Sequence, residues 1–202
     1  MSFWTVHPIE VWEQIQDNGS VRVDPKRLNP DGYVHPPYQW LASRLTSRVT
    51  DSSGNLPWFA YCERPDLRWI RHSRKAGQVN VLIEFFPPPG NAFVFPVWAW
   101  NTIFCCKYLA FNRAEQREWN RKMREFNGRT YNTYWGSPFV KLQAELEESW
   151  ERLFSPKLPR HSWQRDGMSC LEAVVPVIRL NWVKRVQVFV GSGAWMKTSI
   201  SR

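Results

Sequence analysis

The sequence predicts an α+β fold. Segments rich in β-branched and aromatic residues, typical of strands, gather in two groups instead of alternating one by one with helices. The expected order is strand, helix, strand, helix, three strands, two helices and two closing strands, which argues against a doubly wound sheet. With 202 residues the chain can bury a sizeable core, so we expect a single domain over residues 1–190 and a polar tail over 191–202.

The first half of the chain supplies most of the expected strands. Residues 3–7 read as a short strand with Trp4 and Val6 on one face, and Pro8 suits the first turn of a helix that stops at Gly19. A second short strand follows at 21–23, and a loop then leads to a helix over 37–49, where apolar residues recur at helical spacing. Strands are expected again at 56–62 and, most clearly, at 79–86.

The second half is expected to be mainly helical before its closing strands. Residues 92–104 are predicted as a strand followed by a turn, and 111–126 as a helix with Trp119 and Met123 on its apolar stripe. Ser137 and Pro138 are typical of a helix start, so a second helix is expected to about residue 153. The stretch 169–189 reads as strand, short crossover, strand.

Composition and motifs favour some functional classes and argue against others. The net charge of +9 favours a polyanionic partner, with nucleic acid ahead of an acidic protein or a membrane surface. The four cysteines show no metal-ligand spacing, so we expect neither a metal site nor a disulfide framework. The chain lacks a signal peptide pattern and an apolar run of membrane-spanning length, which favours a cytoplasmic protein. It also lacks the glycine-rich and nucleophile motifs of kinases, dehydrogenases and hydrolases.

Two basic stretches predict a nucleic-acid-binding surface. In residues 64–75 arginines alternate with Trp69, a pattern that suits phosphate contact combined with base stacking. The helix over 111–126 adds a second positive surface. The alternatives are an ordinary solvated face or an acidic protein partner. The predicted nucleic-acid-binding residues are Arg64, Arg68, Trp69, Arg71, Arg74, Lys75, Arg121, Lys122 and Arg124.

Glu172 is the candidate catalytic residue. It is the one carboxylate in the apolar run over residues 171–175. Burying a neutral polar group without a hydrogen bond costs on the order of 2–7 kcal/mol, and burying an unpaired carboxylate costs more. Glu172 could have a charge partner, could meet a ligand, or could lie at a strand edge with its carboxylate in water. Glu84, inside the strong strand over 79–86, is a weaker candidate for the same role.

Both ends of the chain resemble ADP-ribosyltransferases that modify nucleic acid, the DarT-like enzymes in particular. Residues 4–7, followed by a helix and Gly19, resemble their first strand and helix, in which the strand carries a tyrosine–histidine pair. Residues 170–172, Cys-Leu-Glu, occupy the place of their Q-x-E motif, and residues 183–189 that of the last strand. The resemblance covers about the first 20 and the last 35 residues. Thr5 and Cys170 depart from the family pattern.

The resemblance implies a split β-sandwich of ADP-ribosyltransferase type with peripheral helices around a cleft for NAD. Glu172 would hydrogen-bond a ribose hydroxyl and stabilise the positive charge that develops as nicotinamide leaves, without help from a metal. For each aromatic residue the alternative is ordinary core packing, and His7 could instead pair with the following helix. The predicted NAD-contacting residues are Trp4, Thr5, His7, Trp58 and Tyr61.

The sequence therefore predicts a NAD-dependent ADP-ribosyltransferase that modifies nucleic acid. RNA is favoured because single strands expose bases for stacking. The nearest resemblance within the family is to the mRNA-modifying toxin of bacterial toxin–antitoxin–chaperone phage-defence modules, which would imply an antitoxin and a SecB-like chaperone as partners. One alternative is a non-enzymatic basic RNA-binding or interaction module. Another is a different consumer of NAD, such as an RNA 2′-phosphotransferase or a glycohydrolase.

Overall fold

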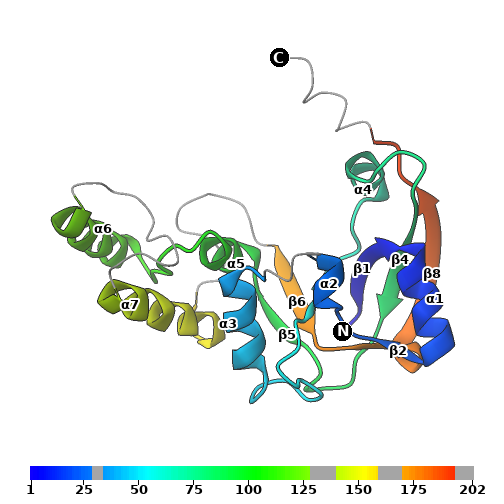
Figure 1. Cartoon of the computed structure of the whole chain (residues 1–202), viewed down its shortest axis with the longest axis horizontal. Coiled ribbons are helices and arrows are strands. Elements are labelled where there is room, and N and C mark those ends of the chain that lie inside the picture. The colour runs from blue at the N-terminus through cyan, green and yellow to red at the C-terminus, as the bar shows by residue number, and fades with distance from the viewer. Residues whose placement is uncertain (29–33, 128–139, 159–169, 194–202) are drawn as a thin grey trace. The chain divides into compact units, whose positions relative to one another are not determined.

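The computed structural model describes residues 1–28, 34–127, 140–158 and 170–193 (Figure 1). The chain divides into two compact units. Unit 1 comprises Met1–Val34, Leu41–Val94 and Glu172–Arg202, and unit 2 comprises His35–Trp40 and Phe95–Leu171. Helices combine with a six-stranded sheet and a small two-stranded sheet, which confirms the predicted α+β class.

The large sheet brings the two ends of the chain together. Its order is β5-β6-β3-β1-β4-β8, and the pairs β1–β3, β1–β4, β3–β6 and β4–β8 are antiparallel. The first strand thus lies at the centre, with closing strands on either side of it. The small sheet pairs β2 (Ser20–Val21) with β7 (Ile178–Arg179). The strands of the large sheet are β1 (Phe3–Pro8), β3 (Trp58–Tyr61), β4 (Val79–Phe85), β5 (Phe93–Pro96), β6 (Leu171–Val175) and β8 (Val183–Val190).

Helix α1 (Ile9–Asn18) covers one face of the sheet, which we call the α1 face. Its Val11 and Ile15 are buried in one cluster with Ile83 and Ala173 of the strands. Gly19 ends the helix with a φ of 71°, the left-handed conformation that glycine adopts without strain. Both boundaries agree with the sequence prediction.

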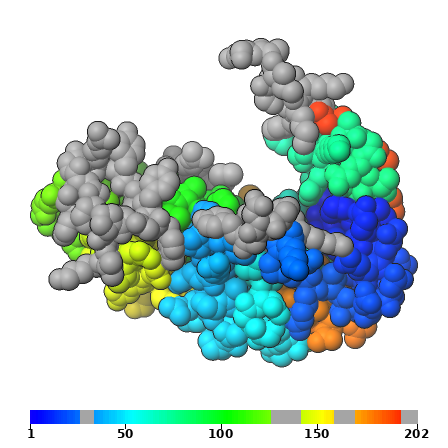
Figure 2. Space-filling model, in the orientation of Figure 1, coloured from blue at the N-terminus to red at the C-terminus, as the bar shows by residue number. Residues whose placement is uncertain are grey.

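Helix α4 (Leu67–Ser73) packs on the opposite face, which we call the α4 face. Ile70 is buried with Val6, Leu82 and Phe189. The Asp66 carboxylate caps the helix by accepting a hydrogen bond from a backbone N–H of the first turn. The sequence does not predict this helix, because seven residues with one buried side chain show no apolar periodicity. On the surface of unit 1, the α4 region adjoins the first residues of the chain (Figure 2).

In the described part of unit 2, helices predominate and strand residues lie at its borders. The prediction of a strand and a turn over 92–104 was wrong beyond Pro96, since residues 97–104 form a helix that buries Ala99, Trp100 and Ile103 on one side. The helical spacing of these residues outweighs their individual preference for strands. The helices of this unit are α5 (Val97–Phe104), α6 (Arg113–Asn127), α7 (Val140–Trp150) and the 3-10 helix η1 (Glu151–Phe154).

Two tryptophans anchor the core of unit 2. The Trp150 ring is fully buried, and its Nε1 donates a hydrogen bond to the Lys107 carbonyl at 2.9 Å. Trp40 meets it edge-on, with 5.4 Å between ring centroids. Trp40 lies in α3 (Pro36–Leu45), which ends four residues before the predicted boundary at Val49. The remaining short helices are α2 (Pro25–Leu28) and η2 (Leu180–Trp182).

The residues that follow β8 are bound to α4. The Ser192 N–H donates to the Arg71 carbonyl and the Gly193 N–H to the Arg74 carbonyl, both at 2.9 Å. A Cβ on Gly191 would lie 2.3 Å from the Lys75 carbonyl oxygen, so this close approach requires glycine. The first residues of the predicted tail therefore hold the end of α4 in place, and residues 194–202 lie outside the described residues.

Candidate active site on the α4 face

One line of opposed residues crosses the large sheet and joins both ends of the chain. Directly opposed residues of antiparallel strands point to the same face. Trp4 is the member of this line on β1. Val6 follows it by two residues and packs against Ile70 of α4. The whole line therefore lies on the α4 face. We call it the register row, and its members are, in order, Glu172, Tyr61, Trp4, Glu84 and Arg185.

Glu172 is partly buried and lacks a protein partner among the described residues, none of which donates a hydrogen bond or forms an ion pair with its carboxylate. Burial raises the pKa of this carboxyl above its ordinary value of 4.5. The opposed Tyr61 is 39% exposed, and burial together with the Glu172 charge raises the pKa of its phenol. Among the described residues, none therefore competes with a ligand for the Glu172 carboxylate.

Main-chain pairing between β1 and β3 ends beside the register row, and we call the place where it ends the split. In the described chain these strands share one register pair, and it belongs to the row. Next to that pair, one carbonyl on each strand accepts a hydrogen bond from a side chain. The Phe59 carbonyl accepts a hydrogen bond from Thr5 Oγ1 at 3.0 Å, and the Val6 carbonyl accepts one from Arg74 Nη2 at 3.2 Å. These two carbonyl groups beside the split therefore have hydrogen-bond donors within the protein.

Thr5, His7 and Trp58 lie on the α1 face, because Thr5 and His7 alternate with Trp4 along β1. The Thr5 hydroxyl donates to a carbonyl, so it accepts from the His7 Nε2–H at 2.7 Å. The His7 ring meets Trp58 edge-on at 4.5 Å. Burial, and secondly the Arg74 charge, lowers the pKa of His7 to about 4, so its ring is neutral at pH 7.

The structure thus divides the five residues predicted to contact NAD. Trp4 and Tyr61 share a face with Glu172, whereas the other three form a linked group on the opposite side of the sheet. That group lies on the α1 face beside the split, where Thr5 donates to a carbonyl of β3. The alternation of side chains along each strand is a signal in the sequence that could have separated the two sets.

Helix α4 carries an exposed aromatic and basic surface on the same face as Glu172. Trp69 is 64% exposed, and the exposed Arg68 side chain forms an ion pair with Asp66 at 2.8 Å. Arg71 and Lys75 are also exposed. Arg74 differs from its neighbours, because its guanidinium turns inward to the Val6 carbonyl of β1.

The basic residues predicted on α6 belong to unit 2 and have carboxylate partners. Arg121 forms ion pairs with Glu118 at 2.6 Å and Glu125 at 2.5 Å, and Lys122 pairs with Glu145 at 2.5 Å. Arg124 is exposed. A phosphate that approached Arg121 or Lys122 would compete with these carboxylates, so α6 is the weaker part of the predicted surface.

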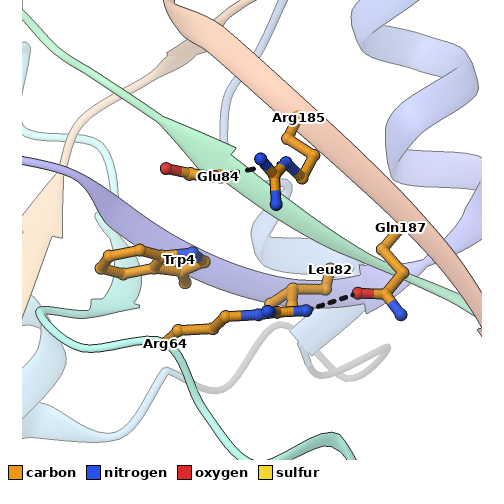
Figure 3. A pocket seen from close by; sticks show the side chains of 6 residues that line it. All are labelled: Trp4, Arg64, Leu82, Glu84, Arg185 and Gln187. Carbon is orange, nitrogen blue, oxygen red and sulfur yellow. Dashed lines mark hydrogen bonds and ion pairs between the residues drawn. The ribbon is translucent and has the colours of Figure 1, made fainter.

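A small depression adjoins the register row on the side of β4 and β8 (Figure 3). It encloses about 190 Å³ including its open mouth, and it combines a tryptophan with two arginines, a glutamine and a carboxylate. Arg185 and Gln187 were not among the predicted site residues. Alternation along the closing strand, which places residues 185, 187 and 189 on one face, could have found them. Its lining residues are Trp4, Arg64, Leu82, Glu84, Arg185 and Gln187.

Other kinds of site receive no support from the part of the chain that the structure describes. There, no three His, Cys, Asp or Glu side chains come close enough together to hold a metal ion. All four cysteines are free thiols. Among the described helices, none has the length and apolar character required to cross a bilayer.

Comparison with known families places the chain in one of them. A family described as a domain of unknown function (DUF3841) matches residues 2–184. The chain belongs to the DUF3841 family. No curated protein and no solved structure matches it. The DUF3841 match includes four members of the register row and ends one residue before the fifth, Arg185.

Proposed function

We propose that this DUF3841 chain is a NAD-dependent ADP-ribosyltransferase that modifies nucleic acid, RNA in preference to DNA. One observation carries the proposal. Glu172, whose carboxylate has no partner among the described residues, lies on the same face as Trp4, with Tyr61 between them in the register row. The two segments that resemble ADP-ribosyltransferases, one from each end of the chain, therefore meet on a single surface.

The chemistry of the row suits cleavage of the bond between nicotinamide and ribose. As the bond breaks, nicotinamide leaves as a neutral molecule and positive charge develops on the ribose. The Glu172 carboxylate accepts a hydrogen bond from a ribose hydroxyl and stabilises that charge. A base or hydroxyl of the acceptor then attacks the ribose carbon and loses its proton to Glu172, whose raised pKa makes it a stronger base. Tyr61, which is opposed to Glu172 in the register row, supplies a flat wall beside the nicotinamide ring.

The split between β1 and β3 supports the same proposal at the level of the fold. An ADP-ribosyltransferase-type sandwich is expected to split around its NAD cleft. Here the split begins next to Tyr61, within one strand of Glu172. Thr5 and Arg74 donate to carbonyl groups of these strands, so this arrangement does not depend on a ligand.

The nucleic-acid part of the proposal rests on α4. Trp69 offers an exposed ring, and Arg68, Arg71 and Lys75 offer positive charge on the same face as Glu172. Aromatic rings among cations bind single strands by stacking and by phosphate contact. A role as an anti-phage toxin, with an antitoxin and a SecB-like chaperone as partners in the cytoplasm, rests on the resemblance alone.

A non-enzymatic RNA-binding module is the second candidate. The open shape of the depression favours it, because its roughly 190 Å³ include solvent at the mouth, whereas a small-molecule site buries most of its ligand. An enzyme would have to bind NAD along the split and the open face, not within the depression. Both candidates bind RNA, so only turnover separates them.

Transfer of labelled ADP-ribose from NAD to RNA tests the proposal. The Glu172→Gln variant keeps the shape of the side chain but removes its charge, and transfer should fall at least about a hundredfold. Glu13→Gln, an exposed glutamate on α1, is the matched control and should leave transfer unchanged. Transfer that persists in Glu172→Gln would remove this residue from catalysis. Nicotinamide release without a labelled RNA product would instead indicate a glycohydrolase.

A further inference from the structure

The depression beside the register row combines a flat apolar wall with mixed charge. Trp4 and Leu82 form the wall, and side chains from β4, β8 and the segment before α4 surround it (Figure 3). All of its lining residues belong to unit 1. It lies on the same face as Glu172 and α4, but neither the catalytic role of Glu172 nor the α4 surface accounts for it.

Two guanidinium groups at the depression have donors to spare. Arg64 Nη2 donates to Gln187 Oε1 at 2.9 Å, which uses one of the five N–H donors of the group. Arg185 Nε lies 3.8 Å from Glu84 Oε2, near enough for an ion pair but beyond hydrogen-bond range, and the Arg185 side chain is 66% exposed. A phosphate can therefore bind both groups without breaking an existing hydrogen bond of Arg185.

Glu84 argues against a site for a bare anion. Its side chain is 12% exposed, it accepts a hydrogen bond from Ser2 Oγ at 3.1 Å, and Lys184 Nζ lies 3.6 Å away. A carboxylate at this position repels an isolated phosphate or sulfate. It favours a ligand that brings N–H donors together with negative charge, and the amino and imino groups on nucleobase edges are such donors.

Trp4 supplies the surface on which a base can stack. Its ring is only partly buried, and it packs on the cluster formed by Val6 and Leu82. Stacking on an exposed aromatic face is tolerant of sequence and is worth roughly 1–3 kcal/mol per base. The depression is open to solvent, so a base would stack on Trp4 at its mouth and would not be enclosed.

We propose that this depression binds one unstacked nucleotide of the acceptor strand. The base lies against Trp4 with its N–H edge toward Glu84, and the phosphate lies between Arg64 and Arg185. Two strand spacings separate Trp4 from Glu172, about 10 Å, so the Tyr61–Glu172 part of the row stays open for the ribose of NAD. The inference rests on the proposed function, because it names the acceptor subsite of the same enzyme.

Binding without turnover tests this inference. Anisotropy of a labelled single-stranded RNA octamer is measured with Glu172→Gln protein and no NAD. Adding Arg185→Ala should weaken binding about tenfold and lower the salt slope by about 0.7. Adding Gln187→Glu, nearly the same shape but negative, should weaken it by a similar factor. Lys26→Ala removes an exposed cation elsewhere in unit 1 and should change affinity less than about twofold.

Competition identifies the ligand chemistry in the same assay. A nucleoside 5′-monophosphate should displace the octamer from the Glu172→Gln protein, and inorganic phosphate at equal concentration should not. The proposal is overturned if both depression variants bind RNA as the Lys26 control does, if phosphate competes equally well, or if the variants weaken binding of NAD and not of RNA. Because the assay needs no turnover, an inactive protein that binds as expected contradicts the proposed function and leaves this subsite standing.

Discussion

Glu172 is unusual for a residue inside a strand, because its carboxylate is partly buried and none of the described residues hydrogen-bonds to it. A side chain that only stabilised the fold would be expected to have a partner. A buried carboxylate without a partner lowers stability, and a hydrogen bond from a ligand would offset this cost. The sequence already marked this residue as a lone carboxylate in an apolar run.

The Glu172→Gln substitution should therefore not destabilise the protein at neutral pH. Burial raises the folded-state pKa of Glu172, so the unfolded chain releases the proton more readily and wild-type stability falls as pH rises through that pKa. The amide has no such penalty. Melting temperatures measured from pH 4 to 8 should show the variant equal to or above wild type at pH 7, with the gap closing toward pH 4. A lower melting temperature at pH 7 would mean that the carboxylate has a stabilising partner.

His7 should show the opposite dependence on pH. Its pKa is lowered from 6.5 to about 4. Between pH 6.5 and pH 4, His7 therefore binds a proton in the unfolded chain but not in the folded protein. Wild-type stability should fall as pH drops from 6.5 to 4, by at most about 3 kcal/mol from this residue. His7→Gln should remove that part of the loss in urea titrations at pH 7 and pH 4.5. The same loss in both proteins would show that His7 is protonated in the folded state.

The Thr5 hydroxyl should matter for the split between β1 and β3. Thr5→Val keeps the shape but removes the hydroxyl donor to the Phe59 carbonyl, which should cost about 1–3 kcal/mol. Thr5→Ser keeps the hydroxyl and is the matched control. Urea unfolding compares the two variants, and equal losses in both would assign the effect to packing instead of the hydrogen bond.

At the scale of elements, long and periodic segments were predictable and short ones were not. Helix α1 and strand β4 agree with the sequence because caps and β-branched residues mark them. Helix α4 was missed because it is held by Ile70, one cap and the segment after β8, two of which act through tertiary contacts. Each strand of the register row was predicted from the sequence. The order of the strands in the sheet depends on tertiary contacts, so the register row itself could not be predicted.

The surface of α4 should account for much of the salt dependence of RNA binding. Replacing Arg71 and Lys75 together by alanine should weaken binding and lower the slope of log K against log salt by about 1.4, two contacts at about 0.7 each. Arg74 is left intact because it supports β1. Arg121→Ala with Lys122→Ala on α6 is the comparison pair, and it should change the slope less because both cations already have carboxylate partners. An equal effect of the two pairs would contradict this ranking.

At the scale of the whole molecule, the chain passes between its two compact units four times, and α3 contributes residues to both. Neither unit can therefore be separated by a single cut. We expect one cooperative thermal transition, in which the calorimetric and van't Hoff enthalpies agree. Two resolved transitions would show that the predicted single domain over residues 1–190 is two independent folding units.

The central claim is that Glu172 and its neighbours in the register row form a site for NAD. Nicotinamide release from NAD, followed over time with and without single-stranded RNA, tests it most directly. Wild-type protein and the Glu13→Gln control should release nicotinamide faster when RNA is present, and Glu172→Gln should release it at least about a hundredfold more slowly. The claim would be contradicted by no release from the folded wild-type protein under any of these conditions, or by equal release from wild type and Glu172→Gln.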